Sequence, residues 1–274
     1  YKAIFAMPES ISKEKIDSMK LYGAEVRLCK SVPFTDQEHY FHVAAKLGEE
    51  PKCFFTNQFE NLANYRAHKD GTGPEIFAQL GEKLDAFVCA CGTGGTLAGV
   101  GTALMERKPS VRLFLADPQG SGLFNRVCRG VMYTKEEAEG KRLKNPFDTV
   151  TEGVGINRIT ENFKVLLGRS GMLEGAVKVS DAEAVAMSRF VAKHDGLFIG
   201  SSSAVNLVSA VRVAQSLGPG HCVCTIACDS GLRHMTKFWS DEYLATHNLT
   251  SRDVTDVSLS FLDDNVVNPA RCYD

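Results

Sequence analysis

The chain has 274 residues, 44% hydrophobic and 23% charged, and its 31 basic and 33 acidic residues give a formal net charge of −2. This composition is typical of a globular protein with one large core or two smaller domains, and the charge gives no sign of a nucleic-acid or anionic-membrane partner. No apolar run reaches the length of a membrane span. Because the chain begins at Tyr1, inside a strand-like pattern, we expect a fragment of a longer protein whose targeting region would precede it.

Strand-like and helix-like segments alternate along most of the sequence. In chain order, the apolar segments typical of strands are residues 1–8, 24–29, 53–58, 85–91, 111–117, 175–180, 197–200 and 221–229. The segments between them with helical patterns are residues 12–23, 35–50, 71–84, 96–108, 161–171, 181–196, 202–218 and 231–244. This order predicts an α/β fold with a mostly parallel twisted sheet and helices on both faces.

Local signals place several boundaries. Ser12 is expected to cap the first helix and Gly23 to end it, while Pro74 begins a later helix that ends near Gly81. Regular structure lapses from Pro118 to about Thr160, a long stretch that includes the charged run "TKEEAEGKRLKNP". The last residues, 248–274, have no assignable pattern.

The nine cysteines do not predict disulfides. Cys89 and Cys91 alternate along one strand-like run, as Cys222 and Cys224 do along another, so each pair shares a strand face where free cysteine packs as a small hydrophobe. A metal site at Cys222, Cys224 and Cys228 lacks the usual C-x-x-C spacing. We therefore expect no metal and a reducing compartment, the cytosol or the mitochondrion.

Two histidines offer a weaker metal alternative. His39 and His42 are three residues apart, a spacing that places both on one face of a predicted helix. No matching carboxylate or cysteine stands beside them in the sequence, so we expect partly exposed side chains and no bound metal.

The segment "GTGGT", Gly92 to Thr96, follows an apolar strand and begins a helix. Glycines let the backbone adopt positive φ and approach a ligand, and the N–H groups at a helix start favour an anion. The lysine of a P-loop and the third glycine of a dinucleotide fingerprint are both missing, because Thr96 and Leu97 stand there. A phosphate monoester fits better than a nucleotide, and a glycine turn that serves packing alone is the alternative.

A second strand-to-helix turn, "GLFIGSSSA", contains Ser201, Ser202 and Ser203. One possibility is simple helix capping. Another is a hydrolase elbow with Ser202 as nucleophile, followed by Asp229 and His234, although these partners stand closer in sequence than such enzymes usually allow. The third joins both turns, with a serine donating a hydrogen bond to a phosphorylated heteroaromatic cofactor such as pyridoxal phosphate.

Five segments resemble the cysteine synthase and cystathionine β-synthase family of pyridoxal-phosphate enzymes, which have fold type II. They are "NQFENLANYRAH" (57–68), "GTGGT" (92–96), "TEGVGINRIT" (151–160), "GLFIGSSSA" (196–204) and "CDSGLRHMTKFWSDEYL" (228–244). The resemblance runs from Tyr1 to about Leu244 in the family's order and is closest to fungal-type cysteine synthases. It departs at Ala204, where the family usually has glycine.

The resemblance implies a role for each matching residue. The cofactor phosphate would be bound by Gly92, Thr93, Gly94, Gly95 and Thr96, and the pyridine nitrogen would contact Ser202. Gln58 would bind the substrate carboxylate, and Gly153 with Gly155 would leave room beside the ring. No lysine stands in the family's S-x-K setting, so the catalytic Schiff-base lysine is expected upstream of Tyr1 and the fragment alone is expected to be inactive.

The resemblance also implies an activity and an organisation. The expected reaction is a β-replacement that forms L-cysteine from an activated serine of the O-acetylserine type and sulfide or another thiol, in a homodimer. The alternatives are a cystathionine β-synthase-like or serine/threonine lyase and a catalytically silent paralogue. The expected domains are the remainder of a small N-terminal α/β domain (1–55), a large cofactor-binding domain (56–245) and a C-terminal tail (246–274).

Overall fold

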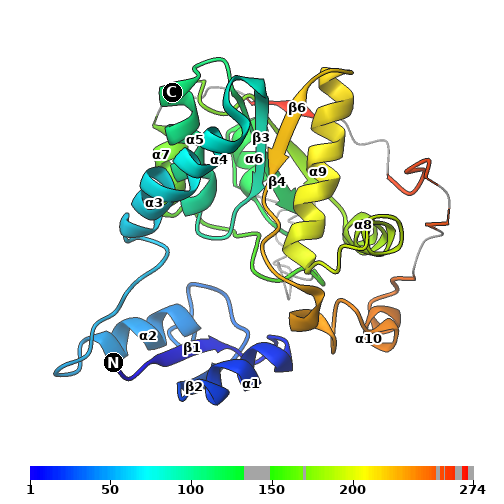
Figure 1. The fold of residues 1–274 in the computed structure, drawn as a ribbon. Helices are drawn as coiled ribbons and strands as arrows, with labels where there is room; N and C mark the ends of the chain where they lie inside the picture. Colours follow the sequence, from blue (N-terminus) through cyan, green and yellow to red (C-terminus); the bar gives the residue numbers. More distant parts are fainter. Residues whose placement is uncertain (133–148, 169–170, 251–253, 256, 263–266, 271–274) are drawn as a thin grey trace.

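A computed structural model describes residues 1–132, 149–168, 171–250, 254–255, 257–262 and 267–270. The chain contains two separate sheets, a small one formed by its first thirty residues and a larger one that follows (Figure 1). The charged run at residues 134–146, which the sequence places in the irregular stretch, lies outside the described residues.

The smaller sheet contains two parallel strands, β1 (Ile4–Pro8) and β2 (Glu25–Cys29). Helix α1 (Lys13–Leu21) connects them, and α2 (Tyr40–Gly48) follows. Gly23 has the positive φ of 83° that the sequence predicted for the end of the first helix. Ser12 stands at the cap position, but its hydroxyl forms no capping bond and instead donates to Glu152, 140 residues away.

The larger sheet has the strand order β6-β3-β4-β5-β7. All neighbouring strands are parallel except for β7, which pairs antiparallel with β5 at the edge. The strands are β3 (Leu84–Ala90), β4 (Arg112–Pro118), β5 (Gly175–Val179), β6 (Cys222–Thr225) and β7 (Asn268–Pro269). The predicted mostly parallel sheet is therefore confirmed.

Helices cover both faces of this sheet, as predicted (Figure 1). On one face lie α4 (Gly73–Leu80), α5 (Gly95–Arg107), α6 (Leu123–Arg129) and α7 (Glu161–Leu167), with α3 (Ala63–Ala67) and the π-helical turn η1 (His68–Thr72) packed on α5. On the other face lie α8 (Asp181–His194), α9 (Ser201–Leu217) and α10 (Asp241–Thr246), after the short 3₁₀ turn η3 (Gly231–His234). A further 3₁₀ turn, η2 (Gly81–Lys83), leads into β3.

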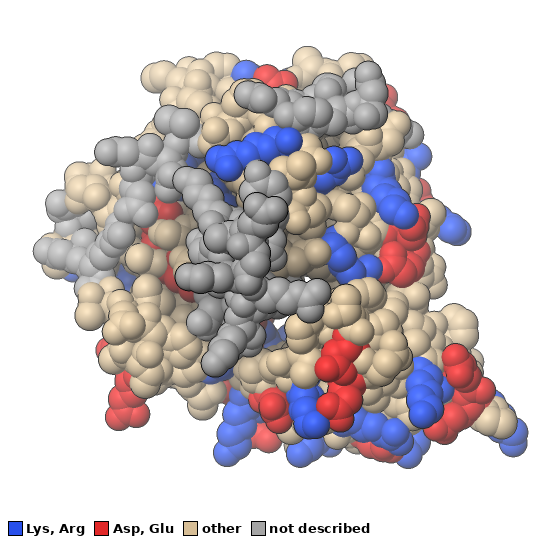
Figure 2. All heavy atoms as spheres, turned by 180° about the vertical axis from the view of Figure 1, so that it is seen from behind, with Lys and Arg blue, Asp and Glu red and all other residues tan. Residues whose placement is uncertain are grey.

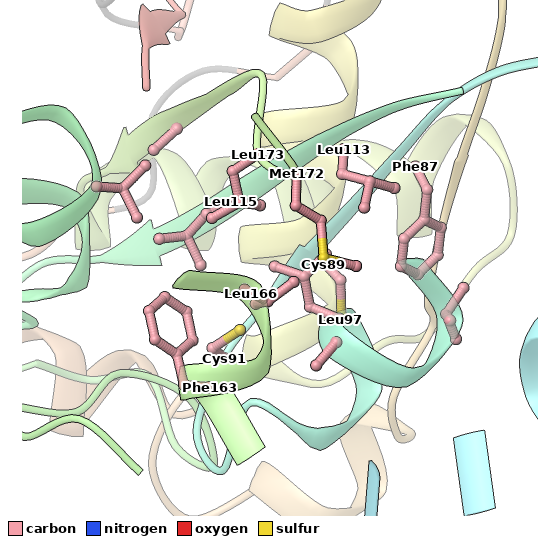
Figure 3. Close-up of a cluster of buried hydrophobic side chains, with 14 of the residues drawn as sticks. Phe87, Cys89, Cys91, Leu97, Leu113, Leu115, Phe163, Leu166, Met172 and Leu173 are labelled. Carbon is pink, nitrogen blue, oxygen red and sulfur yellow. The ribbon is translucent and has the colours of Figure 1, made fainter. Parts of the chain in front are cut away.

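Alternate residues of one strand supply the two cores. In β3, Phe87 and Cys89 contact the α5 side, whereas Ala86 and Val88 contact the α9 side. Cys89 and Cys91 are 3% and 2% exposed and point into the same apolar cluster (Figure 3). Burial raises the pKa of both thiols. The prediction that this pair packs as small hydrophobes is therefore confirmed.

Several expected elements differ from the structure. The helix expected at 231–244 is the 3₁₀ turn η3 followed by the separate helix α10, and α6 lies within the stretch 118–160 that was expected to lack regular structure. Residues 53–57 form no strand, and Phe54 is largely exposed, because this segment connects the two sheets over the surface. Residues 197–200 supply only an isolated bridge between Ile199 and Ser230. The second helix begins at Tyr40, five residues later than expected, where the side chain of His39 caps it.

Other surface features bear on possible partners. No helix of the described chain combines the length and apolar character that crossing a membrane requires. Basic and acidic side chains are interspersed over the lower part of the face in Figure 2.

The eight cysteines in the described residues are free thiols, and these residues contain no group of three or more side chains arranged to hold a metal ion. His42 instead hydrogen-bonds the carbonyl of Phe34 at 2.6 Å.

Candidate functional site

The glycine loop connects the carboxyl end of β3 to α5. Gly94 caps the helix with φ 87°, a left-handed conformation that favours glycine. The N–H groups of Thr96 and Leu97 in the first helical turn have no acceptor among the described residues. The predicted strand–loop–helix geometry is thus present, with open donors at the positive end of the helix dipole.

The hydroxyl of Thr93 gives the clearest sign of a missing partner. Its Oγ1 accepts N–H groups from Asn64 Nδ2 at 2.9 Å and from the backbone of Gly95 at 3.3 Å. A hydroxyl has two acceptor lone pairs and one proton, so both acceptor positions are filled. The proton has no acceptor among the described residues, and an anion in the loop would supply one.

The segment 151–158 lies directly against the glycine loop. The backbone N–H of Gly155 donates to Cys91 at 2.8 Å, and a side chain at Gly92 would meet the carbonyl of Gly153 at 2.7 Å. Gly153 itself has φ 84°, and a Cβ there would meet nothing within 4 Å. The structure therefore brings these predicted cofactor residues together and leaves free space beside Gly153.

The close packing of this loop also answers the alternative of a purely structural turn. A Cβ at Gly95 would lie 2.2 Å from Asn64 Oδ1, so protein contacts alone require glycine at Gly92 and Gly95. Gly92 and Gly95 are thus explained by packing, and an anion is indicated instead by the unused proton of Thr93 and the open N–H groups.

Ser202 lies in the first turn of α9, 6% exposed, and its hydroxyl contacts the thiol of Cys228. Two bonds connect the start of α9 to the segment 151–158 and to the end of β3. The hydroxyl of Ser201 accepts the N–H of Glu152 at 3.0 Å, and the side chain of Asn206 accepts the N–H of Ala90 at 2.7 Å. Ser202 therefore lies at the same strand-end edge as the glycine loop.

The hydrolase alternative does not fit this geometry. His234 is only 1% exposed, and its Nε2 lies 2.9 Å from Asp229 Oδ2. Its Nδ1 has no hydrogen-bond partner in the described chain and lies 3.9 Å from Glu152. No hydrogen bond joins His234 to Ser202 among the described residues, so the general base that a serine nucleophile needs is missing.

Gln58 is exposed and lies next to the glycine loop, which it contacts through Asn64. Its carbonyl accepts a hydrogen bond from Asn64 Nδ2 at 2.9 Å, the same amide that contacts Thr93, and one from Asn162 Nδ2 at 3.2 Å. These contacts place the backbone of Gln58 beside the glycine loop.

Sequence reasoning gave no role to several residues that shape this site. Asn64 and His68 contact Thr93 and Thr96, and Thr160 donates to the carbonyl of Thr93 at 2.6 Å. Asn64 and His68 are four residues apart within "NQFENLANYRAH", a spacing that predicts a shared helix face. The sequence did not indicate that this face contacts the glycine loop.

Glu152 connects this site to the N-terminal segment. Its carboxylate accepts hydrogen bonds from the backbone and hydroxyl of Ser12 at 3.0 and 2.9 Å, from Lys15 at 2.7 Å and from Lys237 at 3.0 Å. Burial alone would raise the pKa of Glu152, but the two lysines outweigh burial and hold it below its usual value. This carboxylate therefore fastens α1 next to Gly153.

Replacing Glu152 by glutamine should lower the free energy of unfolding by about 1–2 kcal/mol at neutral pH, because two partly buried lysines lose their counter-charge. The folded-state pKa lies below the unfolded one, so the contribution is complete above the ordinary glutamate pKa and disappears as the pH falls through the folded value. Urea unfolding of both proteins from pH 7 to pH 3 measures the difference. Glu25→Gln, at an exposed pair with Lys2, is the control and should change little; a Glu152 effect independent of pH would contradict this account.

The residues present fit pyridoxal phosphate. The glycine loop offers open N–H groups and a free hydroxyl proton for the phosphate, Ser202 offers a hydroxyl at the same sheet edge, and the space beside Gly153 is open. The carboxylate of Glu152, next to this space, forms ion pairs with both Lys15 and Lys237.

Comparison with known proteins agrees with this chemistry. Residues 1–229 match the model of the pyridoxal-phosphate dependent enzyme family. Cysteine synthase 2 of Schizosaccharomyces pombe is 46% identical over 257 residues, which are 91% of this chain and 64% of that protein, so the chain spans less than two thirds of this relative. A putative mitochondrial cysteine synthase of Saccharomyces cerevisiae is 41% identical over 94% of this chain and 67% of its own length.

A solved structure shares the fold. The O-acetylserine dependent cystathionine β-synthase from Helicobacter pylori has a TM-score of 0.71 and 32% identity, covering 86% of this chain and 69% of that one. Its likeness confirms the predicted fold class, a central sheet flanked by helices. With the family match over most of the chain, the site and the fold lead to one conclusion: this chain belongs to the pyridoxal-phosphate dependent enzymes.

Proposed function

We propose that the protein to which these residues belong forms L-cysteine from an activated serine of the O-acetylserine type and sulfide by β-replacement. The unused proton of Thr93 within the glycine loop is the observation that supports a phosphate there. The names of the fungal relatives support the choice of product. A cystathionine β-synthase activity is the second candidate, favoured by the likeness to the Helicobacter pylori enzyme.

Each group of residues would have one task. The N–H groups at the start of α5 and the hydroxyl of Thr93 bind phosphate oxygens, and Ser202 places a neutral hydroxyl at the pyridine nitrogen. Gln58 orients the substrate carboxylate, and Gly153 leaves room for the amino acid. Bound pyridoxal phosphate itself supplies the electron sink for reaction at the amino acid's α-carbon.

Residues 1–274 alone should bind pyridoxal phosphate without catalysing the reaction. No lysine in this sequence has the family's S-x-K setting, and the chain spans less than two thirds of the Schizosaccharomyces pombe relative. We therefore propose activity for the whole protein, acting as a homodimer in the cytosol or the mitochondrion. The free thiols and the name of the Saccharomyces cerevisiae relative support such a compartment.

Removing the free proton of the loop tests the phosphate site. Thr93→Val should weaken the binding of pyridoxal phosphate about 10- to 100-fold, the usual worth of a hydrogen bond to a charged group. Thr102→Val is the matched control, because the Thr102 hydroxyl is buried in α5 without a partner among the described residues. Fluorescence titration of both variants gives the affinities, and equal affinities would contradict the site.

The two candidate activities differ in the thiol that adds to the activated serine, which is sulfide for the first and homocysteine for the second. The whole protein, loaded with pyridoxal phosphate and given O-acetylserine, should form L-cysteine with sulfide faster than it forms cystathionine with homocysteine. Mass spectrometry of the products decides between them. Preference for homocysteine would favour the second candidate, and failure with both acceptors while the cofactor is bound would favour a catalytically silent relative.

A further inference from the structure

A second layer of polar side chains lies behind the threonines of the glycine loop. Asn64 Nδ2 donates to Thr93 Oγ1 at 2.9 Å, and His68 Nε2 lies 3.1 Å from Thr96 Oγ1. Asn64 belongs to α3 and His68 begins η1, one helical turn later. One face of the α3–η1 segment therefore contacts both hydroxyl groups that the loop presents.

Close packing fixes this segment against α5. A Cβ at Gly99 would lie 2.4 Å from the carbonyl oxygen of Tyr65 and 2.6 Å from His68 Cβ, and one at Gly73 would lie 2.5 Å from Ala103 Cβ. The π-helical geometry of η1 is uncommon and is found often at functional sites. This packing fixes His68 Cβ close to α5, and the contacts of its two ring nitrogens orient the imidazole.

His68 contacts a second hydroxyl through its other nitrogen. Its Nδ1 lies 3.0 Å from the Oγ1 of Thr72, so the ring lies between two hydroxyl groups. Burial lowers the pKa of His68, and the ring is therefore neutral at physiological pH, with one N–H and one acceptor nitrogen. Two tautomers are available, and they differ in what Thr96 can do.

In the Nδ1–H tautomer, the ring donates to Thr72 and its Nε2 must accept the proton of Thr96. Thr96 would then present only lone pairs to the loop, which repel an anion. In the Nε2–H tautomer, the ring donates to Thr96 and accepts from Thr72, so the proton of Thr96 is free. Asn64 Nδ2 and the backbone N–H of Gly95 place Thr93 in the same state by filling both of its lone pairs.

We propose that His68 is a positioning residue for phosphate binding: Thr72 holds it as the Nε2–H tautomer, and it turns the hydroxyl proton of Thr96 toward the phosphate. This inference rests on the proposed function, because it takes the glycine loop as the phosphate site. In this tautomer Thr72 donates to Nδ1 and Nε2–H donates to Thr96, across distances of 3.0 and 3.1 Å.

The tautomer can be measured without any ligand. Long-range ¹H–¹⁵N correlation spectra of the imidazole, assigned by comparison with His68→Leu, should show the proton on Nε2. Thr72→Val removes the donor to Nδ1 and should move the ring toward a mixture of tautomers. A wild-type ring with its proton on Nδ1 would overturn the proposal, because Nε2 would then accept the proton of Thr96 and leave none for a phosphate.

Affinity for pyridoxal phosphate tests the consequence. His68→Leu should weaken binding about tenfold or more, whereas His68→Gln retains an N–H near the Nε2 position and should stay within about threefold of wild type. In a Thr96→Val background, His68→Leu should have no further effect. An equal loss in both backgrounds would mean that His68 acts through the fold, and urea unfolding of each variant reports that directly.

Two probes separate this inference from the proposed function. Inorganic phosphate should compete with pyridoxal phosphate, and pyridoxal without its phosphate should bind His68→Leu as well as wild type. Wild-type protein that binds neither phosphate compound contradicts the proposed function, and this inference with it. Wild-type binding that is unchanged in His68→Leu contradicts the inference alone.

Discussion

Replacing Gly94 by alanine should abolish measurable binding of pyridoxal phosphate and lower the free energy of unfolding by about 2–4 kcal/mol. The left-handed backbone costs a non-glycine residue about 1–2 kcal/mol. The added Cβ would also lie 2.8–2.9 Å from Phe163, two of the three contacts being with its backbone, so the loop or α7 must move. Phe163 is 1% exposed in the core, which makes that movement costly.

Two other glycines with positive φ serve as matched controls. Gly23→Ala, at the end of α1, meets nothing within 4 Å, so it should show the conformational cost alone with normal binding. Gly153→Ala also meets nothing within 4 Å, but its methyl group enters the proposed ring space, so stability should match Gly23→Ala while binding falls. Calorimetric unfolding and cofactor titration give both quantities, and normal binding by Gly94→Ala would contradict the phosphate site.

The second large effect concerns an ion pair far from the site. Arg212 in α9 and Glu183 in α8 form a salt bridge in which the side chains are 4% and 0% exposed. Glu183 also accepts hydrogen bonds from the backbone and hydroxyl of Ser180 as part of a capping box. Arg212→Met should lower the free energy of unfolding by about 3–5 kcal/mol, because it leaves a carboxylate buried without its counter-charge.

A double variant distinguishes lost charge pairing from lost packing. Arg212→Met with Glu183→Gln removes both charges, and glutamine can keep the capping box. We expect this protein to be more stable than Arg212→Met alone, since no buried charge remains. Urea unfolding of the two single variants and the double variant measures the coupling. A double variant that loses the sum of both single effects would show that the two charges act independently.

The local pattern of the sequence determined the architecture. Alternate apolar residues in β3 and β4 supply two cores. Because these strands are apolar on both sides and alternate with helices, the sheet they form must be covered by helices on both faces. Gly92 to Thr96 was also readable as an anion loop, because strand, glycines and helix start are contiguous there. The prediction of a strand at 53–58 was wrong, because an apolar run favours a strand but does not supply a neighbouring strand to pair with.

Tertiary structure alone decided how the site residues act on one another. Asn64 meets Thr93 across 29 residues, Glu152 meets Ser12 across 140, and Ser202 faces Cys228 from another element. Such contacts depend on which strand ends lie side by side, and no local periodicity records that order. The sequence thus determined which groups reach the carboxyl edge of the sheet. Only the folded chain determined which hydroxyl protons remain free there, because a hydrogen bond's direction depends on every neighbour that competes for it.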